Sequence, residues 1–357
     1  MTSASNRLRT EPSAGRGEHP SAVARRAVAA AGFTVIAALT PHAALAAVVQ
    51  QDDGGAFDQY VLGVGYADLD DLPEAIAHYT RAIELDPAFT KAYHGRGVAR
   101  AQLNDLDGAL ADFSRVLSLD PTFVKAYLNR GLVLLYRGEP EAALEDLRNA
   151  LALDPDDADA YALRADAQSG AGDREGALAD YTRALALDPT LGDAYAGRGR
   201  VRLAQGDLDG AMADFAAQLE RGYEAAAAHD GLGRAHERRG EPAAAVREYT
   251  QALALEPRSA FRYARRAVAR MAQGDVHGAI EDYTAALAHD PSAPEVHQLR
   301  AAAREEAEYL PEAVADLEEA LARTGEAGQD AIRRRLDALR IRIRPPAALT
   351  DGSRDGG

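Results

Sequence analysis

Along most of this chain, apolar residues at helical spacing run into an acidic residue and a proline, after which a new apolar stretch begins. The segment "LALDPDDADAY", from Leu151 to Tyr161, is one such join. Proline lacks an N–H group and disfavours helix in the residue before it, so each join predicts the end of a helix. Successive joins lie 34 residues apart, with one gap of 68, at Pro87, Pro121, Pro155, Pro189, Pro257 and Pro291.

The spacing predicts eight repeats of 34 residues. Inside the gap, "LERGYEA" around Tyr223 takes the place of a join without changing the register, and one further period after Pro291 reaches Gly325. The predicted repeats are 56–89, 90–123, 124–157, 158–191, 192–225, 226–259, 260–293 and 294–325.

The same residue types recur inside each repeat when the prolines are counted as position 32. Position 4 is aromatic in five repeats, position 8 is Gly or Ala, position 20 is Ala in all eight, and position 24 is Tyr, Phe or Leu. Small residues let two helices approach closely, and the aromatic residues fill the space around the contact. Position 15 is Gly in five repeats and Asp or Asn in the first two, types that tolerate a positive φ at a helix C-terminus. Each repeat is therefore predicted to be a helix–turn–helix unit.

This pattern resembles the tetratricopeptide repeat family over residues 56–325, although the family's usual Trp at position 4 is Tyr here. The resemblance implies an all-α fold, a right-handed α-solenoid of eight stacked helix–turn–helix repeats. Residues 326–345 are predicted to form a C-terminal capping helix, because Ile332, Leu336, Leu339 and Ile343 fall on one side of it among arginines. A basic helix on a membrane surface is the alternative. Residues 346–357 are predicted to be a disordered tail.

The N-terminus has the parts of a secretory signal peptide: a basic segment over 1–26, the apolar "AVAAAGFTVIAALT" over 27–40, and "ALA" at 44–46. We expect cleavage after Ala46, a short extension over 47–55, a periplasmic or secreted mature protein, and no integral membrane span after cleavage. The alternative is an uncleaved anchor, because Ala27–Gln50 contains no Asp, Glu, Lys or Arg, which would also place the repeats outside the cytoplasm. Arg25-Arg26 leaves both the Sec and the twin-arginine export routes open.

Composition and the absence of known motifs argue against several classes of function. The net charge of −16 disfavours nucleic-acid binding, which depends on neutralising phosphates. The absence of cysteine removes disulfides, thiolate metal ligands and cysteine nucleophiles. The repeats leave no room for a catalytic domain, and no catalytic or nucleotide-binding motif is present, so we expect no enzyme activity, no cofactor and no metal. His229 and His236 lie seven residues apart, too far for one ion.

One charged pattern also repeats. Position 7 is Arg and position 23 is Asp in the same six repeats, which predicts a ladder of Arg–Asp pairs. The alternative is that the Arg and Asp side chains do not pair and lie on two faces that are solvated independently. Exposed pairs would contribute only about 0–1 kcal/mol each. The predicted pairs are Arg96–Asp112, Arg130–Asp146, Arg164–Asp180, Arg198–Asp214, Arg266–Asp282 and Arg300–Asp316.

The resemblance also implies a binding groove lined by positions 2, 5, 9, 12 and 13 of each first helix. In the first three repeats these positions are mostly apolar and include both lysines of the chain; the predicted partner-binding residues are Tyr60, Lys91, His94, Val98, Lys125, Leu128, Leu132, Leu135 and Tyr136. The middle repeats are charged there, with Asp159, Asp166, Asp193, Arg200, Asp230, Arg234 and Glu237, and the seventh repeat returns to Phe261, Val268 and Met271. The alternative is that neighbouring repeats bury the leucines.

We therefore expect a non-catalytic protein–protein interaction scaffold, exported to the cell envelope, that holds an extended peptide or an amphipathic helix of a partner protein in its groove. A second interpretation is a structural protein that assembles into homo-oligomers. A third interpretation, binding of an envelope glycan, has less support, because few aromatic residues line the groove.

Overall fold

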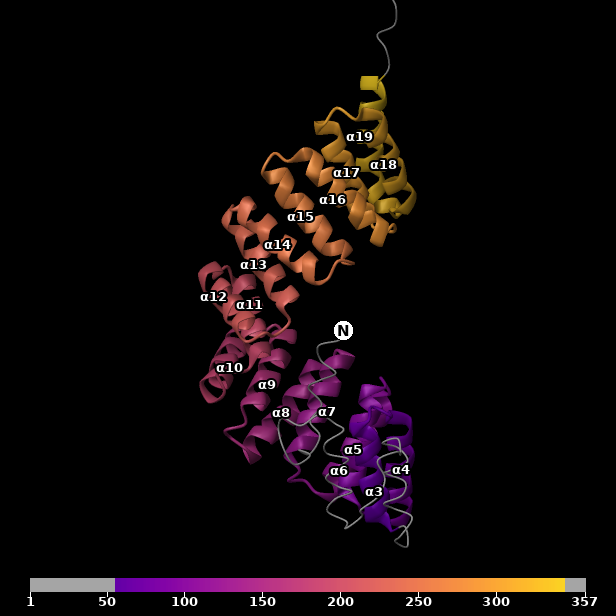
Figure 1. Cartoon of the computed structure of the whole chain (residues 1–357), viewed down its shortest axis with the longest axis vertical. Coiled ribbons are helices and arrows are strands. Elements are labelled where there is room, and N and C mark those ends of the chain that lie inside the picture. The colour runs from indigo at the N-terminus through magenta and orange to yellow at the C-terminus, as the bar shows by residue number, and fades with distance from the viewer. Residues whose placement is uncertain (1–54, 344–357) are drawn as a thin grey trace, which may run out of the picture. The chain divides into compact units, whose positions relative to one another are not determined.

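The structure, a computed structural model, describes residues 55–343, and over this range the chain is all-α, with seventeen helices and no strand (Figure 1). No helix of the described range is long and apolar enough to span a bilayer. The helices are α3 (Ala56–Asp68), α4 (Leu72–Leu85), α5 (Thr90–Gln102), α6 (Leu106–Leu119), α7 (Val124–Arg137), α8 (Pro140–Leu153), α9 (Ala158–Gly170), α10 (Arg174–Leu187), α11 (Gly192–Gln205), α12 (Leu208–Glu220), α13 (Ala225–Arg239), α14 (Pro242–Leu255), α15 (Ala260–Ala272), α16 (Val276–His289), α17 (Pro294–Glu306), α18 (Leu310–Arg323) and α19 (Glu326–Ile343).

The helices pack in consecutive pairs, as in an α-solenoid. In the first compact unit, which ends at Val201, α3 packs on α4, α5 on α6, α7 on α8 and α9 on α10. The first helices of successive pairs are also neighbours, since α5 contacts α3 and α7, and α7 contacts α9. The second unit begins at Arg202, and there α13 packs on α14, α15 on α16, α17 on α18 and α18 on α19. The all-α prediction is confirmed.

The turn inside each pair needs a residue with positive φ. Gly138, Gly172, Gly206, Gly240 and Gly274 have φ between 77° and 91° there. Asp70, Asn104 and Glu308 take the same place in other pairs, with φ of 61°, 65° and 65°. The prediction made from position 15 is therefore confirmed, and Glu308 extends it to a residue type that rarely adopts this conformation.

Aromatic rings at position 24 explain the small residues on the facing helices. A Cβ added to Gly97 in α5 would lie 2.8 Å from Phe113 Cε1 in α6, inside normal contact. The ring at position 24 also faces the next pair: a Cβ on Gly95 would lie 2.7 Å from Tyr79 Cζ, and one on Gly231 would lie 2.6 Å from Phe215 Cζ. Each of these rings is thus held by glycines, and the glycines at position 6 are a feature that the sequence analysis missed.

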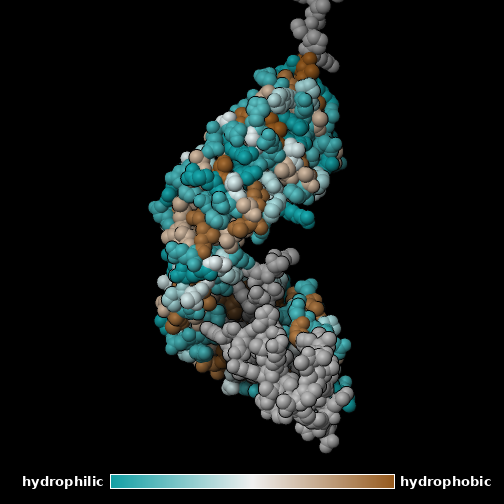
Figure 2. All heavy atoms as spheres, viewed as in Figure 1, coloured by the Kyte–Doolittle hydropathy of each residue, from teal (hydrophilic) through white to brown (hydrophobic). Residues whose placement is uncertain are grey.

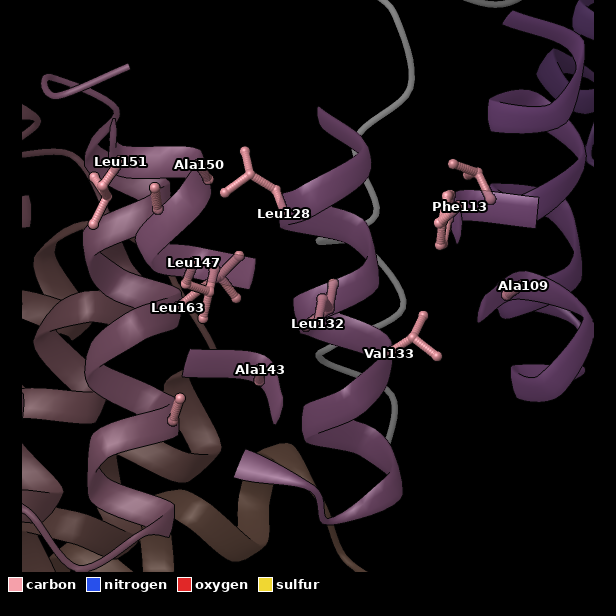
Figure 3. Packing of buried hydrophobic residues seen from close by; sticks show 13 residues of the cluster. Ala109, Phe113, Leu128, Leu132, Val133, Ala143, Leu147, Ala150, Leu151 and Leu163 are labelled. Atoms are coloured by element: carbon pink, nitrogen blue, oxygen red, sulfur yellow. The ribbon is translucent and has the colours of Figure 1, made fainter. Parts of the chain in front are cut away.

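The largest apolar core lies in the first unit, around α7 (Figure 3). Val133 points from α7 toward Phe113, while Leu128 points from the other side of α7 toward Ala150 of α8. Leu147 and Leu163 complete the contact between α8 and α9. α7 is therefore apolar on most of its circumference because it is packed on two sides.

The predicted Arg–Asp ladder is confirmed in the five pairs that lie inside a single unit. Each pair joins the two helices of one repeat through two hydrogen bonds from one guanidinium, as in Arg96 Nε to Asp112 Oδ2 at 3.0 Å and Arg96 Nη2 to Asp112 Oδ1 at 2.7 Å. All five carboxylates are buried, so these are not solvated surface pairs. The other four pairs are Arg130–Asp146, Arg164–Asp180, Arg266–Asp282 and Arg300–Asp316.

Further contacts join the ladder to neighbouring groups. Arg96 Nη1 donates to Thr80 Oγ1 of the preceding repeat at 3.1 Å, and the Arg96 guanidinium lies 5.5 Å from the centre of the Tyr93 ring. A second arginine, Arg100, donates to the same Asp112 carboxylate at 2.7 Å. Equivalent bonds to the preceding repeat run from Arg130 to Ser114, from Arg266 to Thr250 and from Arg300 to Thr284. Arg202 and Arg304 donate as second arginines, and Arg270 forms an ion pair with Asp282 at 3.1 Å. Four of these five pairs therefore also fasten their repeat to the one before it.

At the C-terminal end, α19 buries Ile332, Leu336 and Leu339 against Ala301, Ala313, Leu317 and Ala320. Ile343 was expected on the same side but is 40 % exposed; it is the last residue of α19, beyond the three buried residues. The predicted signal peptide, most of the extension over 47–55 and the predicted tail lie outside the described residues.

Candidate functional site

Four of the nine predicted groove residues lie in the core instead of on a surface. Val98, Leu128 and Leu132 belong to the apolar core around α7, and His94 is also buried. The reason is packing between repeats: His94 contacts Phe123 and Asn129 of the next repeat, and Val98, Leu128 and Leu132 belong to a core with residues from α5 to α9. For these residues the structure supports burial by neighbouring repeats, which the sequence left as the alternative.

His94 shows what this burial does to a polar side chain. Its ring lies between Phe113 and Phe123, with centroid distances of 5.9 and 5.0 Å, and its Nε2 is 3.0 Å from Asn129 Nδ2. Burial, with a smaller contribution from the Lys125 charge, lowers the pKa of His94 to about 4. His94 is therefore a neutral part of the core at physiological pH.

The other five predicted residues remain partly or largely accessible. Lys91 is exposed, and Lys125 and Leu135 are half-buried. Tyr60 is half-buried, with its ring 5.2 Å from that of Phe89 and 5.9 Å from that of Tyr79. Tyr136, at the end of α7, is 42 % exposed. Positions 2, 12 and 13 of the first three repeats are thus at least partly accessible, as is Tyr60 at position 5 of the first repeat.

Leu135 and Tyr136 form one side of an open cavity of about 430 Å³ in the first unit, which we call the α7–α9 pocket. Its walls come from the C-terminal ends of α7 and α9, the first turn of α8, and α11. The lining residues are Leu132, Leu135, Tyr136, Gly138, Pro140, Asp166, Gly170 and Arg200.

The α7–α9 pocket combines an apolar wall with two charged side chains. Its apolar wall comes from Leu132, Leu135 and Pro140, and its charges are Asp166 and the exposed Arg200. Asp166 Oδ1 accepts a hydrogen bond from Tyr181 Oη at 2.5 Å, so this carboxylate is held in place. Across residues 55–343, no cluster of three or more His, Cys, Asp or Glu side chains suits a metal ion. On the face shown in Figure 2, the visible described residues are mostly hydrophilic, with apolar side chains in patches.

The sequence analysis placed Asp166 and Arg200 at groove positions but did not predict that they line one pocket with Leu135 and Tyr136. It missed Gly138, Pro140 and Gly170. A signal was available: Pro140 opens a second helix directly after the Gly138 turn, and a Cβ on Gly170 would lie 3.4 Å from Pro140 Cβ. A glycine at the end of α9 therefore leaves the pocket open. Recognising this signal in the sequence would require knowing that α7 and α9 are neighbours.

Comparison with known families gives matches over much of the repeat region. Family models described as "Tetratricopeptide repeat" match residues 124–157, 158–191, 226–259 and 264–331, and one described as "TPR repeat" matches 65–104 and 99–136. No curated protein matches the chain.

Solved structures show the same fold. PilW, described as a widely conserved type IV pilus biogenesis factor, is 24% identical with a TM-score of 0.53, covering 57% of this chain and 94% of its own. A tetratricopeptide repeat protein from Parabacteroides merdae ATCC 43184 is 19% identical with a TM-score of 0.51, covering 70% and 98%. The APC/C hetero-tetramer Cut9–Hcn1 is 16% identical with a TM-score of 0.56, covering 89% and 63%.

Proposed function

We propose that this chain, which belongs to the tetratricopeptide repeat family, is a non-catalytic scaffold that holds a segment of a partner protein in the α7–α9 pocket. The pocket itself carries the proposal, because an open cavity of about 430 Å³ with an apolar wall suits an apolar side chain of a partner. An anchor that buries about 100 Å² of apolar surface there would contribute about 2.5 kcal/mol. The occupant that fits is an extended peptide or one face of an amphipathic helix.

The test compares capture of envelope proteins by the native chain and by a Leu135→Glu/Tyr136→Glu variant. Both side chains line the pocket and neither is buried, so the variant is expected to fold and to lose its partner. Leu132→Glu is unsuitable because Leu132 is buried and the change would disturb the core. Leu153→Glu is the matched control, since Leu153 is 43 % exposed in the same unit and does not line the pocket. Equal capture by the native chain and the pocket variant would refute the proposal.

The N-terminal sequence indicates the compartment in which the protein acts. The basic segment, the apolar stretch and "ALA" at 44–46 support export to the envelope with cleavage after Ala46. An uncleaved N-terminal anchor is the alternative. Sequencing the N-terminus of the protein isolated from its own cells should give Ala47, whereas retention of residues 1–26 would contradict cleavage.

A second candidate function, self-assembly, is favoured by one observation. Ile341, near the end of α19, is 70 % exposed, and Ile343, the last residue of the helix, is 40 % exposed. An apolar end of this kind could be covered by a second copy. Sedimentation at several concentrations should then show association that Ile341→Glu removes, and a native chain that stays monomeric would exclude this function.

A further inference from the structure

Within residues 55–343, the first helix pair has no preceding pair to cover it, and the later repeats show which positions this leaves open. Ala92, at position 3 of α5, lies in one apolar cluster with Ala82 and Ile83 of α4. Gly95, at position 6, faces the Tyr79 ring of α4, since an added Cβ would lie 2.7 Å from its Cζ. Positions 3 and 6 of a first helix therefore face the pair before it, and in α3 they face the open N-terminal end of the described repeats.

The residues of α3 at this end differ from those of the later repeats. Position 3 is Asp58, where the next five repeats have a buried Ala, and position 6 is Val61, which is 41 % exposed. Phe57 is 66 % exposed, and Asp68 is exposed as well. The other three residues are separated from Val61 by three, four and seven positions, which places them on its side of the helix. We call these four residues the N-terminal end surface.

The C-terminal end of the described residues is formed by α19. Its three buried apolar residues pack on α17 and α18. Ile341 is 70 % exposed, and the exposed Arg334, seven residues before it, lies on the same side of the helix. Arg342, which follows Ile341, is also exposed. We call Arg334, Ile341 and Arg342 the C-terminal end surface.

Both end surfaces expose apolar side chains. The terminal units of a repeat protein that stays alone are polar on the outside, because no further repeat covers them. Phe57 and Val61 lie one turn apart and form one apolar patch at the N-terminal end, and Ile341 is the most exposed large apolar residue of the described range. These residues would be covered if one end packed on the other end of a second copy.

The two ends also carry opposite charge. Residues 56–85, which form α3, α4 and the turn between them, contain six acidic residues and one arginine. That arginine, Arg81, pairs with Glu84. In α19, by contrast, five arginines stand against three acidic residues. Opposite charges attract unlike ends of two copies and keep like ends apart.

The arginines of the C-terminal end surface have no acidic partner of their own. Three other arginines of α19 form ion pairs within the chain: Arg333, Arg335 and Arg340. Arg334 and Arg342 form no ion pair within residues 55–343, and both are exposed. Their charge is therefore available to the carboxylates of another molecule.

We propose that copies of this chain associate head to tail, with the C-terminal end surface of one copy packed on the N-terminal end surface of the next. Ile341 then lies against the apolar patch of α3, and the two free arginines face Asp58 and Asp68. The incoming α19 takes the place that a preceding helix pair has in the later repeats.

This inference rests on the self-assembly given above as the second candidate function, and it adds the surface that the end of α19 meets. A head-to-tail contact joins two different surfaces, so each bound copy keeps one end free for a further copy. A contact between two like ends would instead stop at a dimer.

The experiment blocks the two ends separately in the full chain as it is isolated from its own cells. Phe57→Glu/Val61→Glu alters the N-terminal end surface, and Ile341→Glu alters the C-terminal one. All three side chains are exposed, so both variants are expected to fold, which circular dichroism checks. Sedimentation velocity at several concentrations should show species larger than a dimer for the native chain and only monomers for each variant alone.

An equimolar mixture of the two variants is the decisive sample, because it contains one intact surface of each kind. It should form a heterodimer and nothing larger. A variant that associates on its own, or a mixture that stays monomeric while the native chain associates, would overturn the head-to-tail contact and leave self-assembly standing. A native chain that stays monomeric at every concentration would exclude self-assembly itself, and the ends would then be covered by another occupant.

The matched controls add the same charge at exposed leucines away from both ends. They are Leu103→Glu/Leu153→Glu in the first unit and Leu255→Glu in the second. Both should associate as the native chain does. Loss of association in the controls would show that added negative charge alone separates the copies, and would overturn the inference.

A change at Asp68 tests the role of charge. Asp68→Arg, added to the Ile341→Glu chain, places a like charge opposite Arg334 and Arg342 of the other copy. The heterodimer should then dissociate at several-fold higher concentrations than without this change. An unchanged dissociation constant would overturn the pairing of these charges.

Discussion

The aspartate at position 23 is a single residue that joins the two helices of its repeat. In Asp112 it accepts hydrogen bonds from Arg96 and Arg100 while it is almost completely buried. A buried pair differs from a surface pair, because removing one partner leaves the other charge without compensation. The estimate of about 0–1 kcal/mol made for exposed pairs is therefore too low for the ladder.

We predict that Asp180→Asn destabilises the chain by about 3 kcal/mol, because Arg164 would lose the carboxylate that pairs with it. Asp156→Asn is the control: Asp156 pairs with Arg183 in the same unit, but its side chain is 77 % exposed, and the loss should stay below about 1 kcal/mol. Urea denaturation measures both. Equal effects would show that the ladder does not stabilise the repeats.

His94 predicts a dependence of stability on pH. Its pKa is about 4 in the folded chain and near 6.5 when unfolded, so the unfolded state binds more protons between these values. Stability should therefore fall as the pH is lowered from about 6.5 to 4, by up to about 3 kcal/mol. Melting temperatures of the native chain and of His94→Gln, followed over this range, should converge at low pH. Parallel curves would contradict the buried neutral state.

At the scale of helices, close approach depends on glycines that face rings. Gly97→Ala should destabilise the first unit by about 1–3 kcal/mol, since the new methyl group would meet Phe113 at 2.8 Å. Gly325→Ala is the control, because nothing lies within 4 Å of its added Cβ. Thermal unfolding compares them, and an unchanged melting temperature for Gly97→Ala would mean that α5 and α6 are not packed as closely as the structure shows.

The helix pairs could be predicted from the sequence, and the site could be predicted only in part. The prolines between repeats, the glycines in the turns and the paired occurrence of Arg at position 7 with Asp at position 23 are local or strictly periodic features. They can therefore be recognised in the sequence. Burial of Leu128 and Leu132 depends on which face of α7 meets α8 and α9, and no periodicity within one helix reports that. Leu135 and Tyr136 are accessible, and their role in binding a partner stays a prediction; the pocket also needs Pro140 and Gly170 from other helices.

At the scale of the whole molecule, the described residues form two compact units, and the α7–α9 pocket lies in the first of them. Partner binding in this pocket should therefore be unaffected by a change of charge at an exposed residue of the second unit.

The most direct test of partner binding in the α7–α9 pocket is photo-crosslinking in living cells. Tyr136→p-benzoylphenylalanine places a reactive group at the pocket, and the same substitution at Leu153, exposed to a similar degree outside it, is the control. We predict a discrete crosslinked protein from position 136 that is absent from position 153. The same products from both positions, or none from position 136, would contradict partner binding in this pocket.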